Sequence, residues 1–347
     1  MRNDKNIKWL AVWLLLACGM LAGCGSNPVE KNMENISYEI VESDKLIIYT
    51  SHKEEVYGPI IKEFEERTGI FVEVKKGDTL DIFKEIAKKA GEPCCDVVFG
   101  GGVENYVAYQ DYLEAYRVAE DEMIDPRYRS SGHKWTAFSV LPIVFIYNNK
   151  LVYPVAAPRT WEELQTDRWQ GKVAFADPSK SGSIYTALCT MMQALPQEDE
   201  LILQNFSMTL DGYASPNSGA VLDEVNAGRK LVGITLEETA RKRIEGGADL
   251  EILYPQEGTS AVPDGTAIIK GALHRENARK FLDFTVSRDV QQLLVDEFFR
   301  QAVRTDIRVP DVEQVHGPEM QILDYDIVWA AKEREAILAK WEELQKE

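Results

Sequence analysis

The sequence predicts an α/β protein built of two lobes, and three observations lead to this prediction. Short apolar runs alternate with amphipathic stretches from Lys45 onward, which is the pattern of strands and helices in an α/β sheet. Two longer apolar segments, at 138–147 and 252–268, fit crossover strands between the lobes, with a ligand cleft between them. The chain has 347 residues, of which 45% are hydrophobic, enough for one large or two ordinary cores.

Three strand–helix units are predicted to open the first lobe. Short apolar runs bounded by turn residues predict strands at 46–49, 70–74 and 96–99. Apolar residues recur at helical spacing over 56–64 and 80–90. Gly69 is placed to end the first of these helices, and the third strand runs into Gly100, Gly101 and Gly102.

The second lobe is expected to follow the first crossover strand. Thr160 with Glu163 three residues later forms the pattern of a capping box, which predicts a short helix. Further strands are expected at 172–176 and 231–235, and helices at 184–195, 218–227 and 237–245.

The chain is then expected to return to the first lobe through a strand at 261–269. Helices are predicted within 276–296, and one charged amphipathic helix over 324–344. The first lobe would therefore comprise 45–140 plus 265–347, and the second lobe 141–264.

The N-terminus has the features of a secretory signal. Basic residues precede an apolar run at 9–17, which is too short to cross a bilayer as a lasting helix, since that takes about 20 apolar residues. The sequence Leu-Ala-Gly-Cys at 21–24 resembles the lipobox of bacterial lipoproteins. That resemblance implies a signal peptide at 1–23 and acyl chains such as palmitate on Cys24, with 24–44 as a tether. An ordinary secretory signal with an incidental cysteine is the alternative.

Charge and cysteine usage exclude several classes of partner. The formal net charge of −18 argues against nucleic acid and against anionic lipid as partners of the protein surface. With four histidines and no Cys-x-x-Cys or His-Glu-x-x-His spacing, zinc motifs are absent, and no metal or cofactor is predicted. Cys94, Cys95 and Cys189 form no even disulfide framework. Cys94 and Cys95 are interpreted as buried thiols, with a redox role as the alternative.

Several stretches resemble the extracellular solute-binding proteins of ABC importers, in the branch of ferric-ion, phosphonate and sugar-phosphate binders. They are 49–54, 64–70, 96–102, 146–148, 169–178, 268–272, 278–284 and Gln291, so the resemblance covers nearly all of 45–305. It implies a two-domain, periplasmic-binding-protein-like (type II) fold whose hinged cleft holds a small, anionic solute. It also implies a monomer outside the cytoplasm, in the periplasmic space or on the outer cell surface, that is lipid-anchored to the cell membrane and serves an ABC permease.

Candidate ligand-binding residues gather where helices begin. A helix N-terminus offers unpaired N–H groups and the positive end of a dipole, so it stabilises an anion without a formal cation. Plain helix capping by serine is the alternative. The candidates at helix starts and strand ends are Thr50, Ser51, His52, Gly101, Gly102, Ser179, Ser181, Gly182, Ser183, Ser215, Ser218, Thr235 and Glu237, and Ser139 on the first crossover strand is a weaker one.

His52 bears on the choice between iron and an anionic solute. In the ferric-ion relatives a histidine at this motif ligates the metal, together with two adjacent tyrosines after the strand that corresponds to 231–235. This chain has Leu236, Glu237, Glu238 and Thr239 there, which puts iron in doubt. His52 is able to donate to a phosphate oxygen instead, or to stand in solvent at a helix start.

The sequence therefore favours a substrate-binding lipoprotein for a phosphorylated or phosphonate organic solute. A ferric-ion-binding protein, or a protein that presents its ligand to a membrane sensor kinase, is the alternative. An enzyme that uses Ser181 or Ser183 with His52 is poorly supported, because no Gly-x-Ser-x-Gly elbow is present and no acid partner is placed by spacing.

Overall fold

The computed structural model describes residues 42–308 and 320–346, and its sheet begins with three parallel strands. These are β1 (Lys45–Thr50), β2 (Phe71–Lys76) and β3 (Val97–Gly102), and β1 pairs with both of the others. Helices α2 (Glu54–Thr68) and α3 (Thr79–Lys88) connect them, as parallel pairing requires. Gly69 ends α2 in the left-handed conformation at φ 71°, so the three predicted strand–helix units are confirmed.

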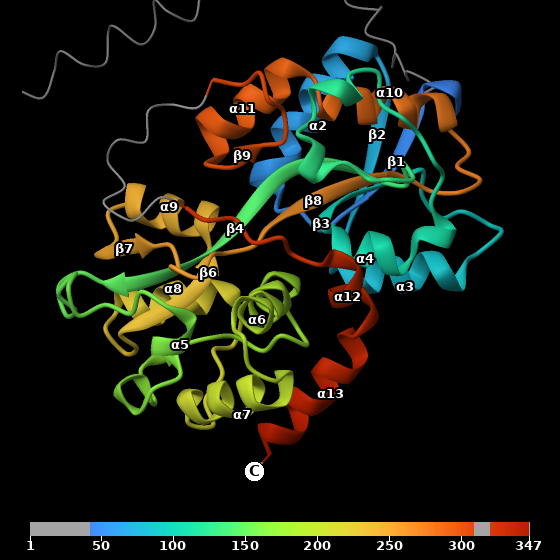
Figure 1. Cartoon of the computed structure of the whole chain (residues 1–347). Coiled ribbons are helices and arrows are strands. Elements are labelled where there is room, and N and C mark those ends of the chain that lie inside the picture. Colours follow the sequence, from blue (N-terminus) through green and yellow to red (C-terminus); the bar gives the residue numbers. More distant parts are fainter. Residues whose placement is uncertain (1–41, 309–319, 347) are drawn as a thin grey trace, which may run out of the picture. The chain divides into compact units, whose positions relative to one another are not determined.

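Strand β4 (Thr136–Asn148) passes through both lobes (Figure 1). Its first part, 136–142, pairs with β8 (Ala261–Ile268), which also pairs with β3. Its second part, 143–148, pairs with β6 (Val232–Leu236) and β7 (Leu250–Leu253). A single crossover strand over 252–268 is therefore wrong. Gly258, at φ 109°, lies in the turn that separates β7 from β8, and only β8 returns to the first lobe.

The second lobe carries β5 (Val173–Ala174), which pairs in parallel with β6 and is shorter than the predicted strand at 172–176. Its helices are α5 (Trp161–Leu164), α6 (Gly182–Ala194), α7 (Asp199–Leu210), α8 (Ser218–Asn226) and α9 (Glu237–Glu245). All but α7 match predicted helices. Thr160 caps α5 by accepting from the Glu163 N–H, but the Glu163 carboxylate accepts from the N–H of Arg159 rather than of Thr160, so the capping box is only half formed.

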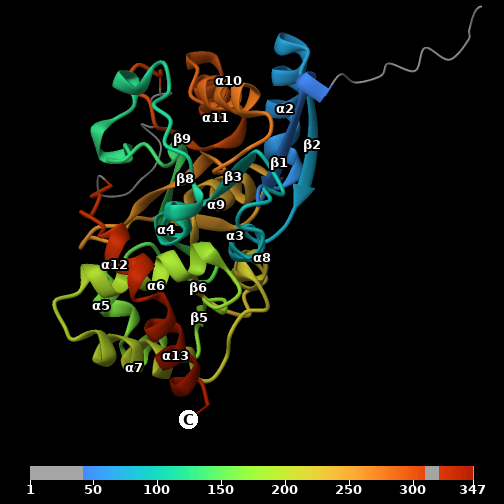
Figure 2. The same ribbon diagram turned by 90° about the vertical axis from the view of Figure 1, so that its right-hand side faces the viewer.

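The C-terminal part returns to the first lobe and then leaves it again. Helices α10 (Arg275–Thr285) and α11 (Arg288–Phe298) lead to β9 (Gln301–Ala302), which pairs with β4. Beyond residue 319, α12 (Ile327–Lys332) and α13 (Arg334–Leu344) replace the single predicted helix over 324–344. The break follows from their packing, because α12 lies against α4 (Val103–Ala108) and α13 against α7, which are different elements of different lobes (Figure 2).

Short 3-10 helices complete the described elements: η1 (Glu42–Asp44), η2 (Gln110–Tyr112), η3 (Asp121–Met123), η4 (Pro126–Tyr128) and η5 (Asp167–Trp169). No helix in the described part of the chain is both long enough and apolar enough to span a bilayer. Cys24, the signal peptide and most of the tether lie outside the described residues, so the lipid anchor stays a prediction.

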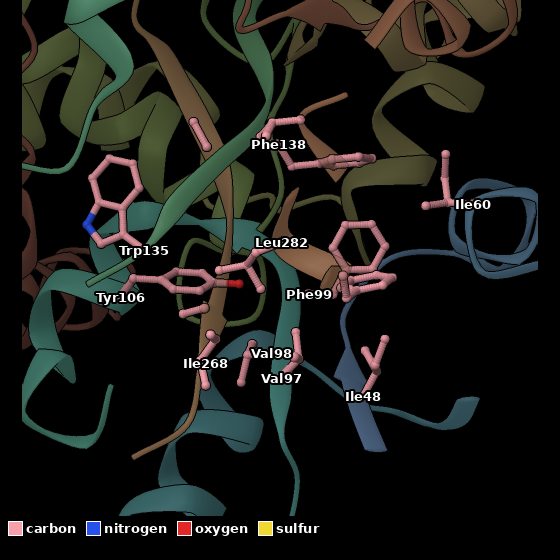
Figure 3. Packing of buried hydrophobic residues seen from close by; sticks show 14 of the residues in the cluster. Ile48, Ile60, Val97, Val98, Phe99, Tyr106, Trp135, Phe138, Ile268 and Leu282 are labelled. Carbon is pink, nitrogen blue, oxygen red and sulfur yellow. The ribbon is translucent and has the colours of Figure 1, made fainter. Parts of the chain in front are cut away.

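Two separate clusters of buried apolar side chains form the cores of the two lobes. The first cluster draws on residues between Leu46 and Val140 and between Ala261 and Val303, and Figure 3 shows Phe99 and Phe138 among its aromatic members. The second cluster draws on residues between Ile143 and Tyr254. It also includes Ala330, Ile337 and Trp341 from α12 and α13, although we expected 265–347 to lie wholly in the first lobe. The lobe boundaries as a whole stay a prediction.

Candidate functional site

A buried ion pair lies where β4 and β8 cross between the lobes. The pairing of these strands shifts register between Ala137 and Ser139, and this brings Ser139 opposite Asp264. The Ser139 N–H and hydroxyl both donate to Asp264 Oδ1, at 2.9 and 2.7 Å. Arg300 Nη1 donates to Asp264 Oδ2 at 2.6 Å and to Ser139 Oγ at 2.9 Å. The Asp264 carboxylate is therefore fully satisfied although only 1% of the residue is exposed.

Arg300 has hydrogen-bonding capacity left over. It is buried, and its Nη2 lies 3.6 Å from Glu238 Oε2 at the start of α9 in the second lobe. Its Nε is buried and makes no hydrogen bond to any described residue. A buried guanidinium N–H without a partner is costly, and a carboxylate or phosphate oxygen would satisfy it.

His52 stands beside this pair, packed between two aromatic rings. Its ring centre lies 4.6 Å from that of Phe99 and 5.5 Å from that of Phe138. Burial lowers the His52 pKa to about 4; the Asp264 carboxylate opposes this shift and the Arg300 guanidinium adds to it. The imidazole is therefore neutral at neutral pH. Its Nε2 lies 3.4 Å from Asp264 Oδ2 and makes no hydrogen bond within the described chain.

Two further residues hold His52 in place. The Thr50 hydroxyl donates to the Phe99 carbonyl at 2.7 Å and accepts from the His52 N–H at 3.1 Å, so it positions the histidine. Gly100 adopts φ 97°, and a Cβ at this position would lie 2.7 Å from the His52 ring. Ser51, between Thr50 and His52, is half-buried.

The end of β3 lies next to the beginning of α6. A Cβ on Gly101 would collide with Thr79, and one on Gly102 with the Glu104 carboxylate. Glu104 Oε1 accepts a 2.8 Å hydrogen bond from Thr186 in the first turns of α6 and a 3.2 Å hydrogen bond from Tyr325. The glycines therefore allow β3 to pack closely against α3 and α4 within the first lobe. Glu104 links both lobes to the C-terminal segment.

The N-terminus of α6 has no side-chain cap. Ser181 occupies the N-cap position, yet its hydroxyl makes no capping bond and lies 3.2 Å from the Ser183 hydroxyl. A Cβ on Gly182 would meet no atom within 4 Å. The N–H groups of this first turn are therefore free of side-chain capping bonds, which suits an anion. Ser179 is exposed and bonds to Asp177 instead.

The remaining candidates are engaged inside the second lobe or between the lobes. The Ser215 hydroxyl donates to Glu224 at 2.7 Å. Helix α8 is capped by Asn217 rather than by Ser218, its half-buried first residue, and Thr235 is buried on β6. The Glu237 carboxylate accepts hydrogen bonds from Arg241 at 2.6 Å, Tyr254 at 2.7 Å and Gln301 at 2.7 Å, so both of its oxygens are occupied.

Sequence reasoning missed Asp264, Arg300, Glu104 and Glu238. A signal existed for Asp264, because it is the one charged residue in a strand whose every residue is buried. Arg300 had no comparable signal, since its partner is remote in the sequence. Among residues 42–308 and 320–346, no group of three or more His, Cys, Asp or Glu side chains could hold a metal ion.

Comparison with known proteins gives the same fold and three kinds of relative. The chain is 21% identical to the Fe(3+)-binding periplasmic protein of Serratia marcescens, over 72% of this chain and 75% of that protein. It is 20% identical to a putative 2-aminoethylphosphonate-binding periplasmic protein of Salmonella typhi, over 72% and 74%. The periplasmic binding protein AfuA of Actinobacillus pleuropneumoniae, solved with fructose-6-phosphate, superposes with a TM-score of 0.76 at 23% identity, over 87% and 98%.

These similarities confirm the predicted two-domain fold of periplasmic binding proteins. The model of one family, bacterial extracellular solute-binding proteins, matches residues 94–327, which is more than half of the chain. The protein therefore belongs to the family of bacterial extracellular solute-binding proteins.

Proposed function

We propose that this protein captures a small phosphorylated or phosphonate organic solute outside the cytoplasm and delivers it to an ABC importer. The observation that carries the proposal is the pair of unsatisfied nitrogen atoms, Arg300 Nε and His52 Nε2, beside the buried carboxylate of Asp264. Arg300 bears a permanent charge, and its planar group matches the geometry of a phosphoryl or phosphonyl oxygen. The solute would bind between the lobes.

The start of α6 supports the same chemistry from the second lobe. Ser181 and Ser183 offer hydroxyls, and the uncapped N–H groups of the first turn lie at the positive end of the α6 dipole. A phosphate group and a neutral organic part are thereby accommodated without further cations. Two relatives agree with this class of solute, one solved with fructose-6-phosphate bound and one named as a putative 2-aminoethylphosphonate-binding protein.

Ferric ion fits the same residues less well, although other relatives are named as ferric-binding proteins. A trivalent cation beside His52 would lie close to the Arg300 guanidinium, and like charges at short range in a buried site repel strongly. The Asp264 carboxylate, the nearest anionic group, already neutralises Arg300. The Asp264 oxygens are therefore occupied and offer iron no free carboxylate ligand, whereas the unpaired Arg300 Nε offers a donor to an anion.

The delivery role includes features that rest on the sequence. We propose that Cys24 carries acyl chains that hold a monomer near its permease, that hinge motion of the lobes encloses the solute, and that no catalytic step takes place. The anchor is tested with Cys24→Ser expressed in a bacterium. The anchor is disproved if this variant stays in the membrane fraction and the intact mass of the wild type shows no fatty acid. Presentation of the bound solute to a sensor kinase is a different output of the same binding event.

The test of solute class compares matched ligands on the purified protein. Fructose 6-phosphate and 2-aminoethylphosphonate are the anionic probes. Fructose and ethanolamine are their control compounds, which carry no phosphate or phosphonate group. Ferric citrate is the metal probe. We expect at least one anionic probe to raise the melting temperature and to give a saturable calorimetric isotherm, while its counterpart does neither. Stabilisation by ferric citrate alone, matched by no effect of citrate, would overturn the proposal.

A further inference from the structure

One carboxylate beside the candidate site has charged neighbours but no hydrogen bond. Glu238 is the second residue of α9, which begins directly after β6 ends at Leu236, so it stands at the carboxyl end of a strand, where ligands of α/β sheets bind. Only 8% of the residue is exposed. Its carboxylate makes no hydrogen bond within the described part of the chain, and the cations beside it are Arg300 Nη2 at 3.6 Å and Lys242 Nζ at 3.8 Å.

Both of these cations are held by other carboxylates. Lys242 Nζ donates to Glu55 Oε1 at 2.7 Å, and Arg300 Nη1 donates to Asp264 Oδ2 at 2.6 Å. These closer bonds keep each cation beyond hydrogen-bonding distance of Glu238. The charge of Glu238 is therefore compensated by its neighbours, yet its oxygens receive no donor. A buried carboxylate without hydrogen bonds is costly, and a ligand that brings a donor removes this cost.

The adjacent acid, Glu237, cannot take the place of Glu238. Its Oε1 accepts hydrogen bonds from Arg241 and Tyr254, and its Oε2 accepts one from Gln301. Both oxygens of Glu237 are thus occupied by the protein itself. Of these two consecutive glutamates, Glu238 alone has a carboxylate that is open to a ligand.

The first lobe contributes the opposite deficiency at the same place. Arg300 Nε is buried and lacks an acceptor, while Nη2 of the same guanidinium lies beside Glu238. One solute satisfies both groups if it carries an anionic acceptor for Arg300 and an N–H or O–H donor for Glu238. A solute that carries only the anionic group brings its charge close to the Glu238 carboxylate, and like charges in a buried site repel.

We propose that Glu238 is a specificity-determining residue, which selects anionic solutes that also carry a hydroxyl or ammonium donor and disfavours those that carry none. This inference rests on the proposed function, because it takes Arg300 as the partner of the anionic group. A site with a buried acceptor discriminates against a ligand that lacks the matching donor, since the acceptor then stays unpaired. Glu238 belongs to the second lobe and Arg300 to the first, so the selected solute bonds to both lobes.

The first test uses the wild type and two matched pairs of ligands in titration calorimetry. 2-Aminoethylphosphonate is paired with propylphosphonate, in which a methyl group replaces the ammonium. Fructose 6-phosphate is paired with hexyl phosphate, which has the same number of carbons and no hydroxyl group. We expect the donor-bearing member of at least one pair to bind at least about tenfold more tightly. The pair that shows this preference distinguishes an ammonium donor from a hydroxyl donor.

The wild-type result separates this inference from the proposed function. If the anionic ligands bind with equal affinity within both pairs, Glu238 does not select for a donor, although the proposed function stands. If none of the ligands binds, the proposed function fails and this inference fails with it.

The second test changes Glu238. Glu238→Gln keeps the volume and removes the charge, so the donor-bearing ligand should bind about tenfold more weakly and its donor-free partner about threefold more tightly. Loss of folding cannot produce these opposite changes. Glu238→Asp keeps the charge but withdraws the carboxylate by one methylene, so it should weaken the donor-bearing ligand without any gain for the donor-free one. A full preference that survives in Glu238→Gln would overturn the inference.

Glu114→Gln is the matched control. Glu114 also has two cationic neighbours, Arg275 and Arg279, and its side chain is 14% exposed. Its N–H bonds to Ile268, the last residue of β8, and not to the part of β8 that carries the candidate site. Glu114→Gln should keep the wild-type affinity for both members of each pair. Equal changes in Glu114→Gln and Glu238→Gln would contradict the assignment, because they would show a general effect of removing a paired carboxylate.

Discussion

Gln301 Nε2 donates a 2.7 Å hydrogen bond to Glu237 Oε2, which joins the first lobe at β9 to the second lobe at α9. Gln301 follows Arg300 directly, and Glu237 precedes Glu238, the second-lobe partner of Arg300. One two-residue segment therefore provides both a contact between the lobes and the buried cation of the candidate site. A solute that binds Arg300 would act where the two lobes meet.

Arg300→Gln is expected to abolish binding of the anionic solute, with a loss of affinity of at least about tenfold, since charged hydrogen bonds contribute about 1.5–3 kcal/mol each. The substitution also leaves Asp264 buried without its cation, so stability falls. Titration calorimetry with the probe that binds the wild type measures the affinity.

Arg304→Gln is the matched control for Arg300. Arg304 is equally buried and pairs with Glu120 and Asp306. It should lose less stability than Arg300→Gln, because its two carboxylate partners are partly exposed, and it should keep the affinity of the wild type. If both variants lose the same affinity, the Arg300 effect is one of folding and not of contact.

His52 should make the stability of the protein fall between about pH 6.5 and its folded pKa of about 4. The unfolded chain binds a proton on His52 in this window and the folded chain does not, so the contribution is complete above the unfolded pKa and is lost as the pH falls. The difference amounts to on the order of 3 kcal/mol. Urea unfolding of the wild type and of His52→Gln at both ends of the window measures it.

The His52→Gln variant should show a shallower decline, and His133→Gln, which replaces a partly exposed histidine elsewhere, should decline as the wild type does. An identical slope in the wild type and His52→Gln would mean that His52 is protonated in the folded state.

Glu104→Gln is expected to be more stable than the wild type, and this advantage should grow as the pH rises. Burial raises the Glu104 pKa, and the hydrogen bonds from Thr186 and Tyr325 only partly oppose this. An acid whose folded pKa is raised contributes most below its unfolded pKa and loses that contribution as the pH rises through the folded value. Glutamine keeps the volume and an acceptor without the charge.

Chemical unfolding at about pH 5 and about pH 8 tests this, with the advantage of Glu104→Gln expected to be larger at the higher pH. Glu104→Ala should instead lose about 1–3 kcal/mol, because it leaves the Thr186 and Tyr325 hydroxyls without their acceptor. If the stability advantage of Glu104→Gln is smaller at the higher pH, the Glu104 pKa is not raised in the folded protein.

Gly182→Ala and Gly100→Ala should separate ligand contact from backbone strain. A methyl group on Gly182 meets nothing within 4 Å, so stability should be kept while solute affinity falls if the ligand approaches the start of α6. Gly100 has a φ of 97°, and a methyl group on it would collide with the His52 ring. Gly100→Ala should therefore lower the free energy of unfolding by about 1–3 kcal/mol. Thermal unfolding and calorimetry measure both quantities. Unchanged affinity in Gly182→Ala would place the solute away from α6.

Much of the fold follows from patterns that are local in the sequence. The strands β1, β3 and β6 and the helices α2, α8 and α9 lie where apolar periodicity and residues such as Gly69 predicted them. Prediction was wrong where packing decides. The helix over 324–344 breaks at Glu333 because its two parts pack on different lobes, and the strand over 252–268 divides because β7 pairs within the second lobe.

The candidate site divides in the same way. Helix starts such as Ser181 and glycines such as Gly100 are visible in the sequence because capping and positive φ are properties of a few neighbouring residues. That Thr50, Ser215 and Glu237 already have internal partners was not visible, since Phe99, Glu224 and Gln301 are brought to them only by folding.

The sequence by itself determined that the chain alternates strands and helices in two lobes and carries the motifs of a family of solute-binding proteins. Only the tertiary structure decided which charges meet. Asp264 and Arg300 are separated in the sequence by the whole of helices α10 and α11. They become a buried ion pair because β8 and β9, which Arg300 directly precedes, both pair with β4. The physical reason is that apolar periodicity is a short-range signal, whereas the partner of a buried charge is selected by the packing of distant strands.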